Sequence, residues 1–233
     1  MSSNIYLSGG GSVKDSYQLD DLFLRAAGEK ILYLPVGLKR TFTGYDECVT
    51  WFTDMISLHN LSKRVSVWID IKNKSHALNR NNFDAIYIGG ASDTSRLHDL
   101  LQRNNFYPQF KIFIKEKGLI YGGSGGASIL GKSINYDQIE KSLPKINESA
   151  ADLCGNYSVF GHLDEENKNI IEGFSEGDVI GIPEGGGCLL DTFQQLITYI
   201  GIPDGMIINQ FGIRILKNIQ SIQYGTIGNN NES

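Results

Sequence analysis

Short apolar runs alternate with segments of helical periodicity along the first 130 residues of the chain. The short runs predict strands at residues 5–7, 30–36, 64–69, 84–88 and 119–121. Between them, apolar residues recur every three or four positions and predict helices at residues 15–27, 45–58, 94–102 and 109–117. Strands that are apolar throughout and alternate with helices are typical of a parallel sheet covered on both faces. We therefore predict an α/β fold with a mostly parallel sheet and helices on both faces.

The pattern changes in the second half of the chain. Residues 132–156 are mixed and polar, which indicates a loop with short helical pieces, and residues 164–172 have helical periodicity. After a predicted strand at 178–183, the apolar period shortens toward two from Cys188 onward, which favours short antiparallel strands in a β-rich C-terminal part. The polar residues 228–233 are expected to form a disordered tail. Because no linker separates two full domains, we predict one domain over residues 1–233.

Charge and cysteine content narrow the range of functions. The net charge is −5 and no cluster of lysine and arginine stands out, which argues against a nucleic-acid surface. The three cysteines lie far apart, so neither a disulfide framework nor a zinc site is expected, and a reducing compartment fits. The N-terminus has no basic leader and the chain no long apolar run, so we expect a cytoplasmic protein without membrane spans.

The segment 119–130 carries the strongest chemical signal. An apolar strand runs into Gly122-Gly123-Ser124-Gly125-Gly126 and then into small and apolar residues at helical spacing. This is the nucleophile-elbow pattern G-x-S-x-G in its strand–turn–helix context, in which glycines let the chain turn sharply and expose the serine. We predict Ser124 as a nucleophile. The same segment also fits a glycine-rich turn that serves packing or binds a phosphate.

Other glycine-rich strand exits are expected beside Ser124. The strands of a parallel sheet end at one edge, so the turns at Gly9, Gly89 and Gly122 should lie together, where sites form in such folds. An oxyanion hole there needs two backbone donors. Gly125 is one candidate, and Gly90 or Ala91 is the other. For the turn at Gly89-Gly90-Ala91, the alternative is a tight strand-to-helix turn without a catalytic role.

A nucleophilic serine needs a base and a group that orients the base. Of the four histidines, His59 fits a helix end, His76 a solvated stretch, and His98 a surface or capping position. His162 follows an apolar run and a glycine, and is the best candidate base, although a loop histidine bonded to backbone fits equally well. Glu184 follows the predicted strand 178–183, where a carboxylate can lie on the same sheet edge as Ser124; the alternative is a surface turn residue.

Four motifs in one order resemble the peptidase S51 family. Gly122 to Ala127 is similar to its nucleophile motif, Ile86 to Thr94 to its glycine-rich loop, Phe160-Gly161-His162 to its histidine segment, and Ile180 to Gly185 to its acidic strand. The resemblance covers nearly the whole chain. Two departures stand out: Gly125 replaces the usual alanine, and Ala91-Ser92-Asp93 replaces the G-N-T run of peptidase E.

The resemblance implies a function and a fold. The family includes aspartyl dipeptidase (peptidase E) and cyanophycinase, with a fold similar to class I glutamine amidotransferases. It implies Ser124, His162 and Glu184 as the catalytic triad, Gly125 with Gly90 or Ala91 as oxyanion donors, and a small peptide as substrate. No metal, cofactor, nucleic acid or membrane is expected as a partner. The protein is expected to be a monomer or a homodimer. Two alternatives stay open: a non-catalytic binding module, and an amidase on a non-peptide substrate.

Overall fold

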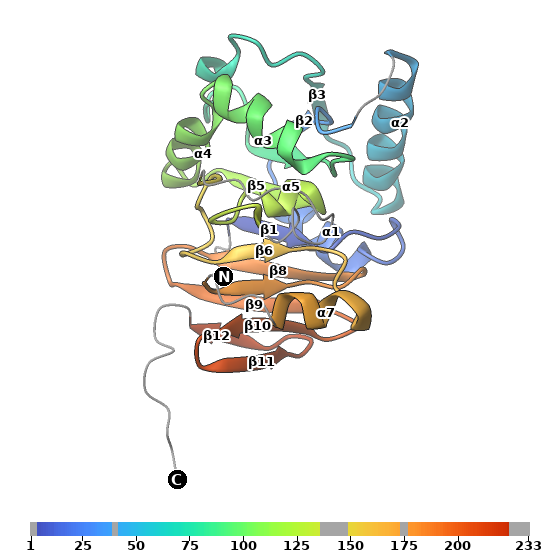
Figure 1. Ribbon diagram of the computed structural model, residues 1–233. Coiled ribbons are helices and arrows are strands. Elements are labelled where there is room, and N and C mark those ends of the chain that lie inside the picture. The colour runs from blue at the N-terminus through green and yellow to red at the C-terminus, as the bar shows by residue number, and fades with distance from the viewer. Residues whose placement is uncertain (1–3, 39–41, 136–148, 173–176, 224–233) are drawn as a thin grey trace.

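The computed structural model describes residues 4–38, 42–135, 149–172 and 177–223 (Figure 1). Its larger sheet has the strand order β12-β9-β8-β1-β5-β4-β2-β3. The parallel strands are β1 (Ile5–Ser8), β2 (Lys30–Leu34), β3 (Arg64–Val67), β4 (Ala85–Ile88) and β5 (Leu119–Gly123). Three antiparallel strands extend the β1 side, namely β8 (Gly186–Asp191), β9 (Leu196–Gly201) and β12 (Ser221–Gln223). The predicted mostly parallel sheet is confirmed.

Helices cover both faces of this sheet, as predicted. On one face, α1 (Tyr17–Ala26) and α2 (Phe42–Leu58) pack on a cluster that includes Tyr6, Tyr33 and Tyr121. On the other lie α3 (Thr94–Arg103), α4 (Phe106–Lys115) and the short α5 (Gly125–Ser128), over a cluster that includes Leu7 and Ile120. Successive strand residues point to opposite faces, which explains why neighbouring residues of β1 and β5 enter different clusters. A short 3₁₀ helix, η1, spans Ser75–Ala77.

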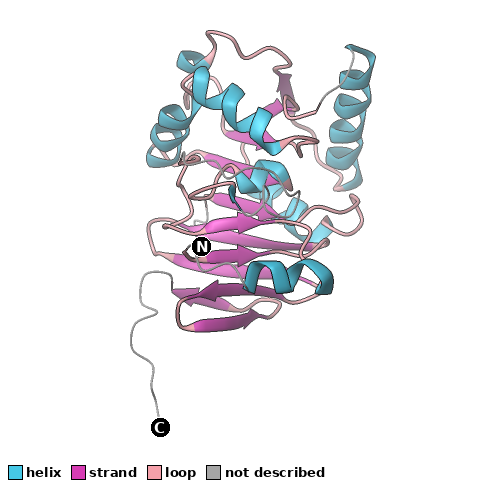
Figure 2. Ribbon diagram, in the orientation of Figure 1, coloured by secondary structure: helices cyan, strands magenta, loops and turns pink. Residues whose placement is uncertain are grey.

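A second sheet, of order β11-β10-β7-β6, forms the rest of the β-rich part (Figure 2). It contains β6 (Ser158–Phe160), β7 (Val179–Gly181), β10 (Gly205–Asn209) and β11 (Gly212–Leu216). Val159, Ile180 and Ile207 join the cluster that holds Leu7. Residues on the other face, such as Phe160 and Val179, pack with Ile171 of α7 (Glu165–Glu172). The strand before Glu184 therefore lies in a second sheet, and its expected place on the edge of the Ser124 sheet was wrong.

Some expectations fall outside the described residues. The tail 228–233 is one of them, and residues 136–148 of the stretch 132–156, where short helical pieces were expected, are also outside. Within the described part of the chain, no helix combines the length and apolar character that a membrane span requires.

Candidate active site

Ser124 lies at the junction of β5 and α5, with φ 50° and ψ −120°. This is an uncommon conformation for a residue other than glycine, and the surrounding packing has to maintain it. A Cβ added at Gly122 would lie 2.5 Å from the Gly126 carbonyl oxygen, and one added at Gly126 would lie 2.6 Å from that of Ile88. The sharp turn therefore requires glycine on both sides of the serine, as the sequence pattern predicted.

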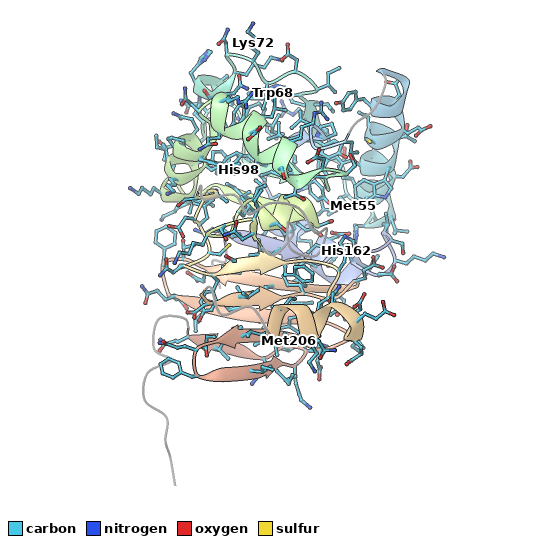
Figure 3. All side chains as sticks on the ribbon, in the orientation of Figure 1. Met55, Trp68, Lys72, His98, His162 and Met206 are labelled. Carbon is cyan, nitrogen blue, oxygen red and sulfur yellow. The ribbon has the colours of Figure 1, made fainter. Side chains whose placement is uncertain are left out.

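The predicted base and its acidic partner both lie next to Ser124. Nε2 of His162 is 2.6 Å from Oγ of Ser124, and Nδ1 is 2.7 Å from Oε1 of Glu184. In the tautomer that donates from Nδ1 to the Glu184 carboxylate, Nε2 of the neutral ring accepts the serine O–H. The two side chains are 46% and 60% exposed, so this chain of hydrogen bonds is open to solvent. Figure 3 shows His162 where the helix-covered upper part meets the lower strands.

The exit of β1 joins the two sheets at this point. Ser8, Gly9 and Gly10 present three successive carbonyl oxygens, one to each segment of the site. They accept hydrogen bonds from the backbone N–H groups of Ser124 at 2.9 Å, His162 at 2.8 Å and Gly185 at 3.1 Å. The Gly9 turn was predicted at the site edge, but not in this role. Three consecutive glycines after a strand were the available signal.

The β1 exit lies so close to the site that it leaves no room for side chains. A Cβ added at Gly9 would overlap the Pro183 carbonyl oxygen. A Cβ at Gly10, whose φ is +102°, would lie 2.5 Å from Cε1 of His162. The imidazole therefore packs directly on backbone, and glycine is needed both for the conformation and for the close approach.

The predicted oxyanion donors border the serine. A Cβ added at Gly90 would lie 3.6 Å from Cβ of Ser124, so the turn after β4 lies against the nucleophile. Within the described residues, the backbone N–H groups of Gly90, Ala91 and Gly125 make no hydrogen bond. None of the three groups is taken up by another acceptor there, and the choice between Gly90 and Ala91 stays open.

The strand that precedes Ser124, β5, is hydrogen-bonded to the buried carboxyl group of Asp20. The Tyr121 hydroxyl donates to Asp20 of α1 at 2.6 Å, and the Ser16 hydroxyl donates to the other carboxyl oxygen at 2.7 Å. Burial raises the pKa of Asp20, while the two hydroxyls lower it. Burial also raises the pKa of Tyr121 well above its usual value, so the phenol stays neutral and donates. This network was not predicted, because no sequence pattern links residues 20 and 121.

The other histidines lie in different surroundings from His162. His59, at the end of α2 as expected, contacts Asp21 through Nδ1 at 3.1 Å. His98 is fully buried, with Nδ1 2.8 Å from the Tyr107 hydroxyl, so the expected surface or capping position was wrong. Its place on the apolar face of α3 explains the burial. Within the described residues, no group of three or more His, Cys, Asp or Glu side chains is arranged to hold a metal ion.

Two solved structures are similar to this fold. A peptidase from an acI-B1 Actinobacterium aligns with a TM-score of 0.74 and 13% identity, over 95% of this chain and 97% of the other. A Listeria monocytogenes EGD-e protein classed with peptidase E aligns with a TM-score of 0.64 and 20% identity, over 86% of this chain and 99% of the other. At these identities the likeness shows the fold. No curated protein matches the sequence.

The family comparison agrees with this fold. Residues 43–170, which include Ser124 and His162, match the CobB/CobQ-like glutamine amidotransferase domain. Because the match extends over more than half of the chain, the protein belongs to the family of CobB/CobQ-like glutamine amidotransferase domains.

Proposed function

We propose that the protein is a serine hydrolase of the peptidase S51 type, which cleaves a small peptide through an acyl-enzyme. The observation that carries this proposal is the chain of hydrogen bonds from Ser124 through His162 to Glu184. Its order along the sequence, serine then histidine then acid, is the order that the S51 resemblance implies. The similarity in fold to two proteins described as peptidases supports the same reaction class.

The proposed reaction has two halves, formation of the acyl-enzyme and its hydrolysis, and the same groups act in both. Oγ of Ser124 attacks the amide carbon while its proton passes to Nε2 of His162, and Glu184 stabilises the resulting imidazolium. The N–H of Gly125, with that of Gly90 or Ala91, stabilises the negative oxygen. The C–N bond then breaks as Nε2 returns the proton to the leaving amine. Water attacks the acyl-serine by the same proton transfers, which releases the acid and restores the hydroxyl.

The test is hydrolysis of a dipeptide panel, including Asp-initiated members, by wild type and Ser124→Ala. Loss of the nucleophile in such a triad typically lowers kcat by about 10⁴-fold or more. Fluorophosphonate should label Ser124 in wild type, and the labelling should disappear with His162→Ala. Equal turnover by wild type and Ser124→Ala would reject the triad. A protein that neither labels nor hydrolyses would instead fit a binding module of the same fold.

Membership of an amidotransferase-domain family supports a second candidate, hydrolysis of a non-peptide amide such as the glutamine side chain. The same serine would form the acyl-enzyme, with ammonia as the leaving group. Ammonia release from glutamine, measured beside the dipeptide panel, distinguishes the two substrates. A cytoplasmic location remains a prediction, with which the three buried free cysteines agree because they fit a reducing compartment. That the protein is a monomer or a homodimer also remains a prediction.

A further inference from the structure

A pocket of about 380 Å³ opens beside the turn that follows β4. Gly90 forms part of its wall and also lies against the nucleophile, because a Cβ added there would be 3.6 Å from Cβ and 3.9 Å from Oγ of Ser124. A substrate whose scissile amide reaches Ser124 therefore has the pocket next to it. The volume is large enough for one bulky side chain.

Aromatic rings form much of the pocket wall. Trp51 of α2, Tyr33 of β2 and Tyr87 of β4 all line it. Tyr33 stacks on Phe52 with ring centroids 4.4 Å apart, and Tyr87 stacks on Tyr121 at 4.3 Å, so both tyrosine rings are fixed by neighbours behind them. Trp51 is 38% exposed, which leaves part of a large apolar surface in contact with water. A ligand that covers this surface gains from its removal from water.

The other described side chains of the wall are Leu38 and Cys48, which add apolar surface, and Glu47. An acidic substrate side chain in this pocket would give up hydration against apolar rings.

On the basis of the proposed hydrolase function, we propose that this pocket is a substrate subsite for a large apolar side chain, preferably aromatic, in a residue next to the scissile amide. This specificity differs from the aspartate preference of the aspartyl dipeptidases that the sequence resembles. Flat, uncharged side chains match the ring-lined walls, and burial of a phenylalanine side chain supplies the selectivity.

The test uses equilibrium binding, so that it does not depend on catalysis. Dipeptides Xaa-Ala and Ala-Xaa, with Xaa as Phe, Ala, Asp or Arg, are titrated calorimetrically into the Ser124→Ala protein. In one of the two series, the Phe peptide should bind about tenfold or more tightly than the Ala peptide, and the Asp peptide no better than the Ala peptide. The side of the scissile bond that shows the preference assigns the subsite.

Trp51→Ala in the Ser124→Ala background should remove most of the Phe preference. The matched control is Phe193→Ala, which removes an aromatic ring from a residue that is 57% exposed. Phe193 follows the far end of β8, whereas Gly187 at the near end pairs with Ser8 beside the site. This control should retain the preference. Circular dichroism verifies that both variants are folded.

Several outcomes would overturn the subsite. They are equal binding of the Phe and Ala peptides in both series, tighter binding of the Asp or Arg peptide, or an unchanged Phe preference in folded Trp51→Ala. Hydrolysis and fluorophosphonate labelling of the wild type are scored separately. A labelled, active enzyme without a Phe preference rejects the subsite alone, whereas selective binding without labelling or turnover rejects the hydrolase and keeps the pocket.

Discussion

At the scale of single residues, the site depends on positions where a side chain is missing. Gly10 brings backbone against the imidazole of His162, and Gly125 allows the turn after Ser124 to approach Ala91. The tightest requirements concern atoms within 3 Å, where a single methyl group forces a displacement. Substitutions at these glycines therefore test the geometry of the site.

Gly10→Ala should disturb the base. The new Cβ would lie 2.5 Å from Cε1 of His162, and because that side chain is exposed it can move away. We expect fluorophosphonate labelling of Ser124 to slow by about 10²-fold, since displacement of a reacting group by about 1 Å has that effect. Gly11→Ala is the matched control: its φ of +105° is almost the same, but its Cβ would meet Asp15 at 3.1 Å and the Gly185 backbone N at 3.3 Å rather than the imidazole. Equal labelling rates in the two variants would contradict the prediction.

The two departures from the S51 motifs are neighbours in space. A Cβ added at Gly125 would lie 2.8 Å from Cβ of Ala91 and 2.9 Å from Oγ1 of Thr94. An alanine at position 125, as in the S51 serine motif, would therefore crowd Ala91, which stands where the peptidase E run has glycine. We therefore expect the residue at position 91 to limit the size of the residue at position 125.

Gly125→Ala alone should destabilise the protein by about 1–3 kcal/mol through overpacking. Adding Ala91→Gly should restore part of this loss, because it removes one of the two nearest side-chain contacts. Urea unfolding of both single variants and the double variant gives the coupling energy, expected above about 0.5 kcal/mol. Additive effects would show that the two positions are independent.

At the scale of elements, two devices hold the nucleophile strand. The β1 exit connects it to the loops after β6 and β7 through three carbonyl oxygens. On the opposite side, α1 is attached to β5 by the bond from Tyr121 to the buried Asp20. Each device joins elements that are far apart in the sequence.

Tyr121→Phe should destabilise the protein in a pH-dependent way. Burial raises the pKa of Asp20 above its ordinary 3.8, but the Tyr121 hydroxyl opposes this by favouring the ionised form. Its stabilisation is therefore present above the folded-state pKa and is lost as the pH falls through that value. We expect about 2 kcal/mol at the alkaline end of a urea-unfolding series and much less at the acidic end.

Tyr6→Phe is the control, because Tyr6 is a buried tyrosine of the same cluster. It should cause no comparable pH-dependent loss. A Tyr121→Phe effect that stays constant across the pH series would mean that the hydroxyl does not act on an ionised Asp20.

At the scale of the whole molecule, the site combines two sheets. Ser124 follows a strand of the larger sheet, whereas His162 and Glu184 follow strands of the smaller one. The two sheets share a core, in which Val159 and Ile180 pack in the same cluster as Leu7 and Ile197. This common core makes the relative position of nucleophile and base a property of the entire fold.

Ile180→Ala tests this shared core. The side chain is fully buried, so its truncation should cost about 2–5 kcal/mol. Both tryptophans, Trp51 and Trp68, lie in the first half of the chain, and their fluorescence should report the loss as a lower urea midpoint. Ile219→Ala, at a residue that is 75% exposed, should leave the midpoint unchanged. A tryptophan midpoint unaffected by Ile180→Ala would indicate that the smaller sheet unfolds independently.

The sequence by itself determined the features that depend on near neighbours. Alternation of apolar strands and helical segments predicted the parallel sheet, since periodicity follows from local backbone geometry. The glycines around Ser124 predicted its turn, because the close approach of Gly122 to Gly126 lies within a few residues, whereas the contact of Gly126 with Ile88 does not. His162 and Glu184 were selected as candidates from their positions after apolar runs. Glu184 was expected near Ser124 on the edge of the same sheet, and the S51 resemblance implied that the three residues form a triad.

Only the tertiary structure decided the features that depend on distant contacts. It assigned β7 to a second sheet, buried His98, joined Asp20 to Tyr121 and brought the β1 carbonyl oxygens to the site. An apolar strand pattern states that a segment is buried but not which segment it pairs with. Partner choice follows from how the whole chain packs and closes its loops, and that information is absent from any single stretch of sequence.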